Sequence, residues 1–148
     1  MLFVRHVLED ARRRLAVLNP GASVADAARA LADRNVPLAI VCDGAGLAVG
    51  VISKIDVIER VVHAGNGALD TSAEQIMTAA VFTCRENETL QSVWEAMSTR
   101  GLRSAPVLDD CLRPLGVLHA RDVVRALLEE VNSQEVLLRD YVLGVGYR

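Results

Sequence analysis

The sequence predicts an α+β protein built from two β-α-β-β-α units in tandem. The first observation behind this prediction is a duplication: Gly50–Val57 and Gly116–Val123 each contain a glycine, a β-branched run and a helix start with an aspartate, 66 residues apart. The second is that Ser23–Val62 aligns with Thr89–Leu128 at this offset without a gap, with nine identical positions. Because a repeat is one supersecondary unit used twice, we expect the same elements in both copies.

Composition limits the class of protein. Of 148 residues, 51% are hydrophobic and 3% aromatic, so aliphatic side chains must build one compact domain or two small units that share a core. A net charge of −3 gives no basic excess for binding nucleic acid or an acidic membrane. The cysteines Cys42, Cys84 and Cys111 match neither a disulfide framework nor a metal-binding CxxC pair. Free thiols, with no signal peptide and no apolar run of about 18 residues, predict a soluble cytoplasmic protein.

The chain begins with a predicted helix and a short strand. Apolar residues in Phe3–Arg14 have helical spacing, and Leu15–Leu18 is a strand candidate closed by the turn Asn19-Pro20-Gly21. The basic run Arg12-Arg13-Arg14 has two interpretations: a solvated helix end whose cations interact with the helix dipole, or a phosphate contact. The first interpretation is favoured.

The first unit continues with a capped helix and a hairpin. Ser23 is the expected N-cap, with Asp26 as its acidic partner three residues later. One buried stripe follows at helical spacing, namely Val24, Ala27, Ala28 and Leu31. Leu38–Asp43 and Leu47–Ser53 are predicted strands joined by a glycine-bearing loop. The next predicted helix is Lys54–Ala64, whose expected inward residues are Ile58, Val61 and Val62.

The second unit repeats this plan after a linker at Ala64–Thr71 and a short helix at Ser72–Met77. Thr89 is the expected N-cap of its first long helix. The apolar stripe of that helix is more typical of a core or a dimer face than of a cofactor site: Leu90, Val93, Trp94 and Met97. The predicted strands are Val81–Cys84, Ala105–Asp109 and Leu115–His119. The last helix is expected to bury Val124, Leu127, Leu128 and Val131.

That last helix continues past the repeat with further apolar residues, Val136, Leu137, Leu138, Tyr141 and Val142. This tail has no counterpart in the first unit, so it needs a partner surface, either its own core or a second copy. One unit alone could not bury its helix stripes and small sheet, whereas two side by side can. The predicted division is residues 1–66 for the first unit with its N-terminal helix, and 67–148 for the second with its extended helix.

Together these features resemble the CBS-domain family, and in particular a stand-alone tandem pair, or Bateman module. The resemblance covers nearly all of the chain from Val7 to about Glu130. The segments that carry it are the helix caps at Ser23 and Thr89, the strands at Asn35–Val41 and Gly101–Val107, the two Gly–Asp turns, and Ile76-Met77-Thr78 before the second unit.

The resemblance implies a fold and a function. It implies two CBS repeats packed with pseudo-two-fold symmetry, two clefts between them, and pairing into a flat homodimer of four repeats. Such clefts commonly hold an adenosine-containing ligand: AMP, ADP, ATP, S-adenosylmethionine or NAD. The family acts as a regulatory sensor rather than as a catalyst, and requires no cofactor.

The residues of the first unit give this expectation a physical basis. Ser53 ends a strand and Lys54 begins a helix, so free backbone N–H groups, a hydroxyl and an ammonium can hold a phosphate. Asp56, one turn into the helix, can accept both hydroxyls of a ribose. Apolar strand residues at Leu38–Val41 or Ala105–Val107 can cover an adenine ring. The resemblance implies the same roles for Ser53 and Asp56.

The second unit departs from this pattern. His119 replaces the hydroxyl residue, while Arg121 and Asp122 remain. Arg121 could take the phosphate role, with Thr78 and Arg103 as further donors, and a histidine here would change its charge near neutral pH. The alternative is that this cleft has lost its ligand and His119 only ends a strand. For Asp56 and Asp122, stabilisation of a helix dipole is an alternative role.

These features leave three classes of function. The favoured one is a regulatory module that binds an adenosine-containing ligand and changes shape or partner in response, as a homodimer with an effector protein that this chain does not reveal. The second is a dimerisation or interaction platform with degenerate, non-binding clefts. An enzyme is disfavoured, because the sequence has no Ser/His/Asp order, metal-ligand cluster or P-loop.

Overall fold

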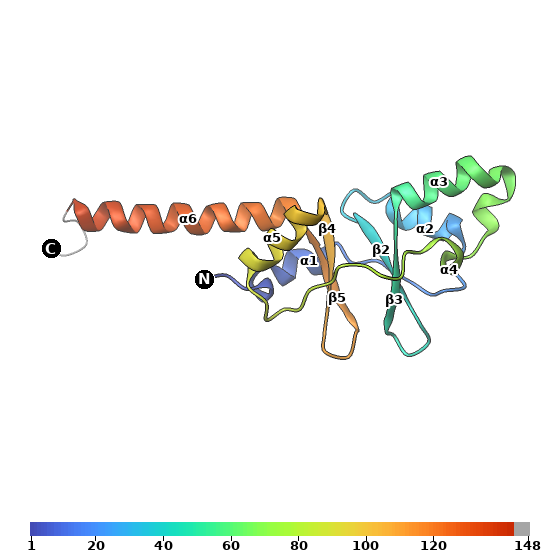
Figure 1. The fold of residues 1–148 in the computed structure, drawn as a ribbon, viewed down its shortest axis with the longest axis horizontal. Coiled ribbons are helices and arrows are strands. Elements are labelled where there is room, and N and C mark those ends of the chain that lie inside the picture. Colours follow the sequence, from blue (N-terminus) through green and yellow to red (C-terminus); the bar gives the residue numbers. More distant parts are fainter. Residues whose placement is uncertain (144–148) are drawn as a thin grey trace.

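The computed structural model describes residues 1–143 and contains the two expected units (Figure 1). A 3₁₀ turn, η1, and a short helix, α1, lead into the first unit. The elements up to its end are η1 (Val4–Val7), α1 (Leu8–Arg13), β1 (Val17–Leu18), α2 (Val24–Leu31), β2 (Leu38–Cys42), β3 (Ala48–Ser53) and α3 (Lys54–Ala64). The remaining elements are η2 (Gly65–Asp70), α4 (Ala73–Ile76), α5 (Leu90–Arg100), β4 (Ser104–Leu108), β5 (Pro114–His119) and α6 (Ala120–Val142).

Local sequence signals explain most of these boundaries. The Ser23 side chain accepts a hydrogen bond from the backbone N–H of Asp26, while the Asp26 carboxylate accepts one from the N–H of Ser23, which completes a capping box at the start of α2. The hydroxyl of Thr89 accepts a hydrogen bond from the N–H of Ser92 at the start of α5. Gly101 ends α5 in the left-handed conformation, with φ of 67°, which glycine adopts without strain.

The two hairpins have the same register. Leu38 faces Ser53 in the β2–β3 hairpin, and Ser104 faces His119 in the β4–β5 hairpin. Each hairpin also has an irregularity at the same place, after Val41 and after Val107. The hairpins lie side by side at the centre of the molecule (Figure 1). The predicted α+β fold of two β-α-β-β-α units is therefore confirmed.

One predicted strand is wrong. In the first unit, β1 pairs in parallel with β2, and the N–H of Ile40 donates to the carbonyl of Ala16 at 2.8 Å. The equivalent of Ile40 in the second unit is Pro106, which has no N–H to donate. The expected strand Val81–Cys84 is therefore reduced to a single bridge between Cys84 and Val107.

The two cores exchange their first helices. Val4, Leu8 and Ala11 of the leading segment are buried in a cluster with α5 and β5 of the second unit. Ala73 of α4, in the linker, is buried with α2 and β3 of the first unit. A third cluster lies between the hairpins and is formed by Leu38, Ile40, Cys42, Val51 and Val117. The division into residues 1–66 and 67–148 stays a prediction. Residues on each side of this boundary pack in the core of the other unit.

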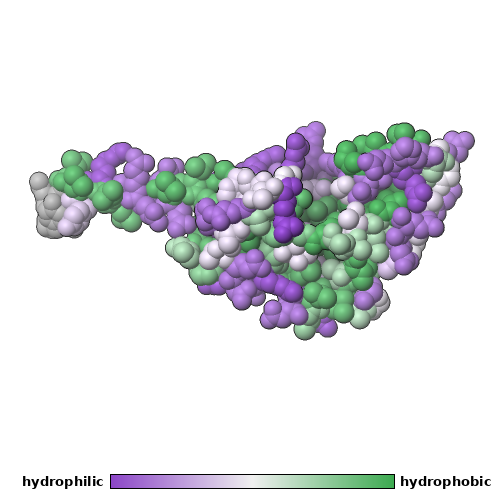
Figure 2. Space-filling view, in the orientation of Figure 1, coloured by the Kyte–Doolittle hydropathy of each residue, from purple (hydrophilic) through white to green (hydrophobic). Residues whose placement is uncertain are grey.

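The expected inward face of α3 is wrong. Ile58, Val61 and Val62 are 55%, 43% and 71% exposed, and no residue of α3 is fully buried. The helix instead uses Val57 to pack on the core of the first unit. The outer face of α3 is therefore an exposed apolar surface (Figure 2).

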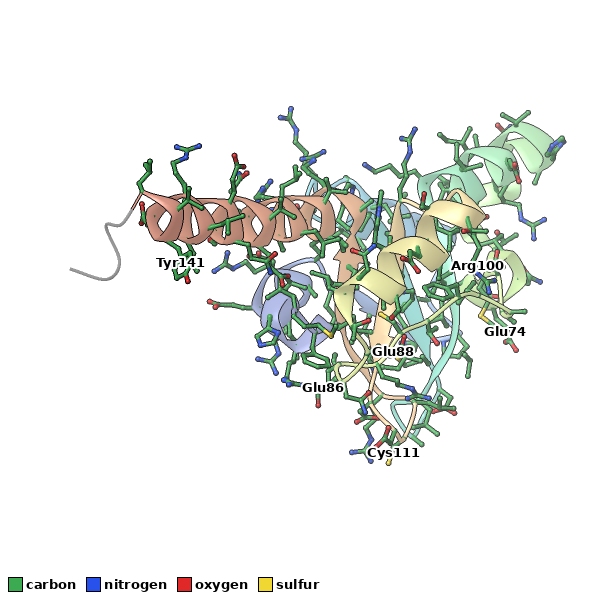
Figure 3. The ribbon with its side chains drawn as sticks, turned by 60° about the vertical axis from the view of Figure 1, so that its left-hand side comes forward. Glu74, Glu86, Glu88, Arg100, Cys111 and Tyr141 are labelled. Carbon is green, nitrogen blue, oxygen red and sulfur yellow. The ribbon has the colours of Figure 1, made fainter. Side chains whose placement is uncertain are left out.

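The apolar tail of α6 does not pack on its own core, which removes one of the two predicted alternatives. Beyond the second unit the helix extends away from the body of the molecule (Figure 1). Leu128 and Val131, expected to be inward, are both 57% exposed. The tail residues Val136, Leu137, Leu138, Tyr141 and Val142 are exposed as well. Figure 3 shows Tyr141 near the far end of this projecting helix.

All three cysteines are free thiols, as predicted. Cys111 is exposed at the tip of the loop between β4 and β5 (Figure 3), whereas Cys42 and Cys84 are buried. Burial raises the pKa of the Cys84 thiol to about 12, so this side chain behaves as a small apolar core residue. Among the described residues, no helix is both long and apolar enough for a membrane span.

Glycine at position 116 is required by a close backbone approach, and this can be tested. A Cβ at this position would lie 2.6 Å from the backbone carbonyl carbon of Ala11. Gly116→Ala is expected to lower the free energy of unfolding by about 1–3 kcal/mol, the usual cost of overpacking, in urea denaturation. The control is Gly44→Ala, where a Cβ meets nothing within 4 Å. Equal stabilities of the two variants would contradict the packing described here.

Candidate functional site

Ser53 and Asp56 form a hydrogen-bonded pair at the start of α3. The backbone N–H of Ser53 donates to Asp56 Oδ2 at 2.8 Å, and the Ser53 hydroxyl donates to the same oxygen at 3.1 Å. The N–H of Asp56 donates to Ser53 Oγ at 3.4 Å. Among the described residues, no group donates a hydrogen bond to the other carboxylate oxygen, Oδ1. The box orients the carboxylate while leaving this oxygen available to a ligand.

Thr78 belongs beside the first unit. Its backbone exchanges two hydrogen bonds with Val51 of β3, at 3.0 and 2.9 Å. The sequence grouped Thr78 with the second unit, but the linker after α4 pairs with β3, two residues before Ser53. The structure therefore places Thr78 with Ser53 and Asp56 instead of with Asp122.

An apolar pocket of about 180 Å³ lies between the two hairpins, and Ser53, Asp56 and Thr78 do not line it themselves. Gly50 and Val51 of β3 line it from one side, Ala79 and Val81 from the linker, and Pro106 from β4. Val51 leads along β3 to Ser53, and Ala79 follows Thr78. We call this pocket, together with Ser53, Asp56 and Thr78, the first cleft.

Lys54 lines a different hollow. Its side chain is exposed and lies with Ala28, Leu31 and Val57 around a shallow apolar groove between α2 and α3. The structure therefore does not bring Lys54 into the pocket that Val51 and Ala79 share.

Asp122, the equivalent of Asp56, has a partner within the chain. Arg14 Nε donates to Asp122 Oδ2 at 2.7 Å, and Arg14 Nη2 donates to Oδ1 at 3.2 Å. The two side chains are 16% and 6% exposed, and Arg125 approaches the same carboxylate at 3.8 Å. A buried bidentate pair of this kind is costly to break from one side, typically about 3–5 kcal/mol, because the other charge is left uncompensated.

Arg14 is a candidate site residue that the sequence pattern does not indicate. The run Arg12-Arg13-Arg14 was interpreted as a solvated helix end, and this is wrong for Arg14, although Arg13 is 68% exposed. The available signal was the comparison of the repeats: at an offset of 66 residues the second unit has Thr78-Ala79-Ala80, with no basic residue.

His119 caps α6 through its imidazole ring. Its Nδ1 accepts a hydrogen bond from the backbone N–H of Arg121 at 3.0 Å. Burial, followed by the nearby charges of Arg14 and Arg121, lowers the pKa of His119 below its ordinary value of 6.5. The charge of His119 therefore changes at a lower pH than its ordinary value predicts. The carbonyl of Arg103 accepts from the N–H of Ala120 at 2.7 Å, so the backbone of Arg103 lies beside this helix start.

Comparison with protein families agrees with this architecture. The family model described as CBS domain matches the chain twice, at residues 4–63 and 73–129. The chain belongs to the CBS domain family. The second half of α6 lies beyond these matched residues.

Other CBS proteins are similar along most of the chain. An uncharacterized 17.7 kDa protein of Acidianus ambivalens is 26% identical over 140 residues, covering 95% of this chain and 84% of that protein. The crystal structure of CBSX2 in complex with AMP is 25% identical, with a TM-score of 0.72, and covers 87% of this chain and 98% of that one. The CBS domain pair of MJ0100, in complex with 5-methylthioadenosine and S-adenosyl-L-methionine, is 25% identical, with a TM-score of 0.69, over 82% and 98% of the two chains.

The chain is shorter than some other relatives. It spans 55% of the MJ1225 protein of Methanocaldococcus jannaschii and 60% of the MK0525 protein of Methanopyrus kandleri.

The neutral cap at His119 predicts a pH effect. Since the pKa of His119 is lower in the folded state than in the unfolded state, its contribution to stability is present above about pH 6.5 and is lost as the pH falls through the folded pKa. His119→Asn keeps a capping side chain but does not titrate. We expect the melting temperature of the wild type to fall more than that of this variant between pH 7.5 and pH 5. His63→Asn, on an exposed position of α3, is the control and should behave as the wild type. Parallel pH profiles for wild type and His119→Asn would contradict the assignment.

Proposed function

We propose that this CBS protein is a regulatory module that binds one adenosine-containing ligand in the first cleft. The observation that carries the proposal is the position of Asp56: its carboxylate is oriented by Ser53, and one of its oxygens has no donor among the described residues. Asp56 follows the end of β3, the strand whose residues Gly50 and Val51 line an apolar pocket. The relatives CBSX2 and MJ0100, whose structures contain AMP, 5-methylthioadenosine and S-adenosyl-L-methionine, support the choice of ligand class.

Each part of such a ligand has a matching group. The apolar walls at Val51 and Val81 suit an adenine ring, and backbone groups of the linker can read its edge. Asp56 accepts hydrogen bonds from the ribose hydroxyls. The start of α3, with the hydroxyl of Thr78, provides donors and a positive helix end for a phosphate. Lys54, exposed in the first turn of α3, adds positive charge near that end of the helix.

AMP is the ligand that we would test first, with ADP, ATP, S-adenosylmethionine and NAD as the alternatives. The phosphate of AMP, ADP, ATP or NAD can accept hydrogen bonds from the N-terminal donors of α3. The ligand acts by differential binding to two states of the module or of its complex with an effector protein. No catalytic step is assigned to this chain.

We also propose that a second copy of the chain covers the exposed apolar residues of α6. Val131 and Leu138 lie seven residues apart and are 57% and 64% exposed, which puts them on one face of the projecting helix. Apolar residues at this spacing are typical of helices that pair with another helix.

A dimerisation platform with non-binding clefts is the second candidate function. It is favoured by the Arg14–Asp122 pair and by the exposed apolar faces of α3 and α6. A thermal-shift screen with adenosine nucleotides separates the two, because a ligand that binds only the folded form raises the melting temperature. A stable dimer whose melting temperature does not move at millimolar ligand would favour the platform.

The role of Asp56 can be tested by substitution. Asp56→Ala is expected to weaken AMP binding by about 1–3 kcal/mol in isothermal titration, because it removes the acceptor of the ribose hydroxyls. Asp26→Ala is the matched control, since Asp26 is the acidic partner of the equivalent capping box at the start of α2. The control should lose the same helix cap and keep its affinity. An equal loss in both variants would mean that Asp56 acts only through the fold.

The dimer can be tested at the α6 tail. Leu138→Glu is expected to convert a dimer into a monomer in sedimentation experiments, because it places a charge in an apolar helix contact. Asn132→Glu adds the same charge at an exposed polar position of the same helix and should leave the assembly intact. If both variants sediment as the wild type does, another surface forms the dimer.

A further inference from the structure

The two clefts of this protein are not equivalent, and one side chain accounts for the difference. We propose that Arg14 occupies the ligand position of the second cleft, so that the chain binds one nucleotide instead of two. This inference rests on the proposed function of the first cleft, but its test can fail independently.

The contacts of Arg14 compete directly with a ribose. Its guanidinium uses both oxygens of Asp122, at 2.7 and 3.2 Å, and these oxygens are the acceptors that a pair of ribose hydroxyls would need. Arg14 Nη1 also donates to the carbonyl of Asn35 at 3.4 Å, so three donors hold the side chain in place. Because charge-assisted bidentate pairs are stronger than neutral hydrogen bonds, hydroxyl groups cannot displace this partner easily.

Among residues 1–143, no charged side chain pairs with Asp56 in the way that Arg14 pairs with Asp122. Two pairs of equivalent contacts show which residues correspond in the two units. Ala11 lies against Gly116, and Met77 lies against Gly50. Leu18 pairs with Val41, and Cys84 pairs with Val107. Both comparisons keep the offset of 66 residues, so the position equivalent to Arg14 is Ala80. Ala80 is exposed, and its methyl group has no polar atom to offer to Asp56.

The residues that surround Asp56 and Asp122 differ as well. Asp122 lines a hollow of about 560 Å³ together with Leu2, Val7 and Ala126, and Arg14 does not line it. The hollow that Arg14 shares with Asp122, of about 380 Å³, is lined by one asparagine and five charged residues, Asp10, Arg13, Arg14, Asp122 and Arg125. Val117 and Val51 both belong to the cluster between the hairpins, but Val117 is 0% exposed, whereas Val51 is 9% exposed and lines the pocket between the hairpins.

The test is the number of AMP molecules bound per chain, measured by equilibrium dialysis and isothermal titration. We expect one for the wild type and two for Arg14→Met, which keeps the aliphatic stem but frees Asp122. Arg13→Met removes a neighbouring exposed arginine and should leave the number at one. Adding Asp122→Asn to Arg14→Met should return it to one, since the second ribose acceptor is then weakened.

The outcomes separate the two proposals. Two sites in the wild type, or one site in both wild type and Arg14→Met, would overturn the role of Arg14 while the first cleft keeps its function. No binding to the wild type would overturn the function of the first cleft. In that case one site in Arg14→Met would still support the role of Arg14, and none would overturn both proposals.

A converse variant covers the case in which Arg14→Met does not fold. Ala80→Arg places a guanidinium at the equivalent exposed position of the first cleft, where it can pair with Asp56. We expect it to weaken AMP binding at least about tenfold, while Ala80→Gln, similar in reach but uncharged, keeps most of the affinity. Unchanged or tighter binding by Ala80→Arg would overturn the inference.

Discussion

The close approach of Ala11 to Gly116 is the constraint on which the rest of the structure depends. A segment from the start of the chain can press against the second unit only because β5 has no Cβ at this point. The linker makes the corresponding contact with β3 at Gly50, where Thr78 pairs with Val51. This exchange of segments builds the two cores, aligns the hairpins and fixes which residues surround each aspartate.

The two units share the same backbone arrangement but differ in their side chains. Both hairpins keep the same register, but Pro106 stands where Ile40 donates a hydrogen bond, and the second sheet loses its parallel strand. Ser53 and His119 both cap the helix that follows, one with a hydroxyl and the other with a neutral imidazole. The difference between Arg14 and Ala80 has the largest effect. Arg14 forms an ion pair with the Asp122 carboxylate, whereas Ala80 has no charged group to pair with Asp56. The backbones of the two units are therefore similar, whereas the side chains around Asp56 and Asp122 differ.

The sequence predicts what local signals determine. Ser23, Ser53 and Thr89 begin helices because their hydroxyls satisfy free backbone N–H groups, and α3 starts and ends where the pattern indicates. Contacts between distant segments are not predicted. The Arg14–Asp122 pair joins residues 108 positions apart, and nothing local indicates it. Periodicity likewise marked Ile58 and Val131 as apolar-face residues but could not tell whether that face meets the same chain.

The most direct measurement of the central claim is a crystal structure of the protein grown with AMP. The account predicts one nucleotide per chain, with its base in the pocket between the hairpins, its ribose on Asp56, and the Arg14–Asp122 pair intact. A nucleotide bound at Asp122 with Arg14 displaced, or a first cleft that stays empty at saturating AMP, would contradict it.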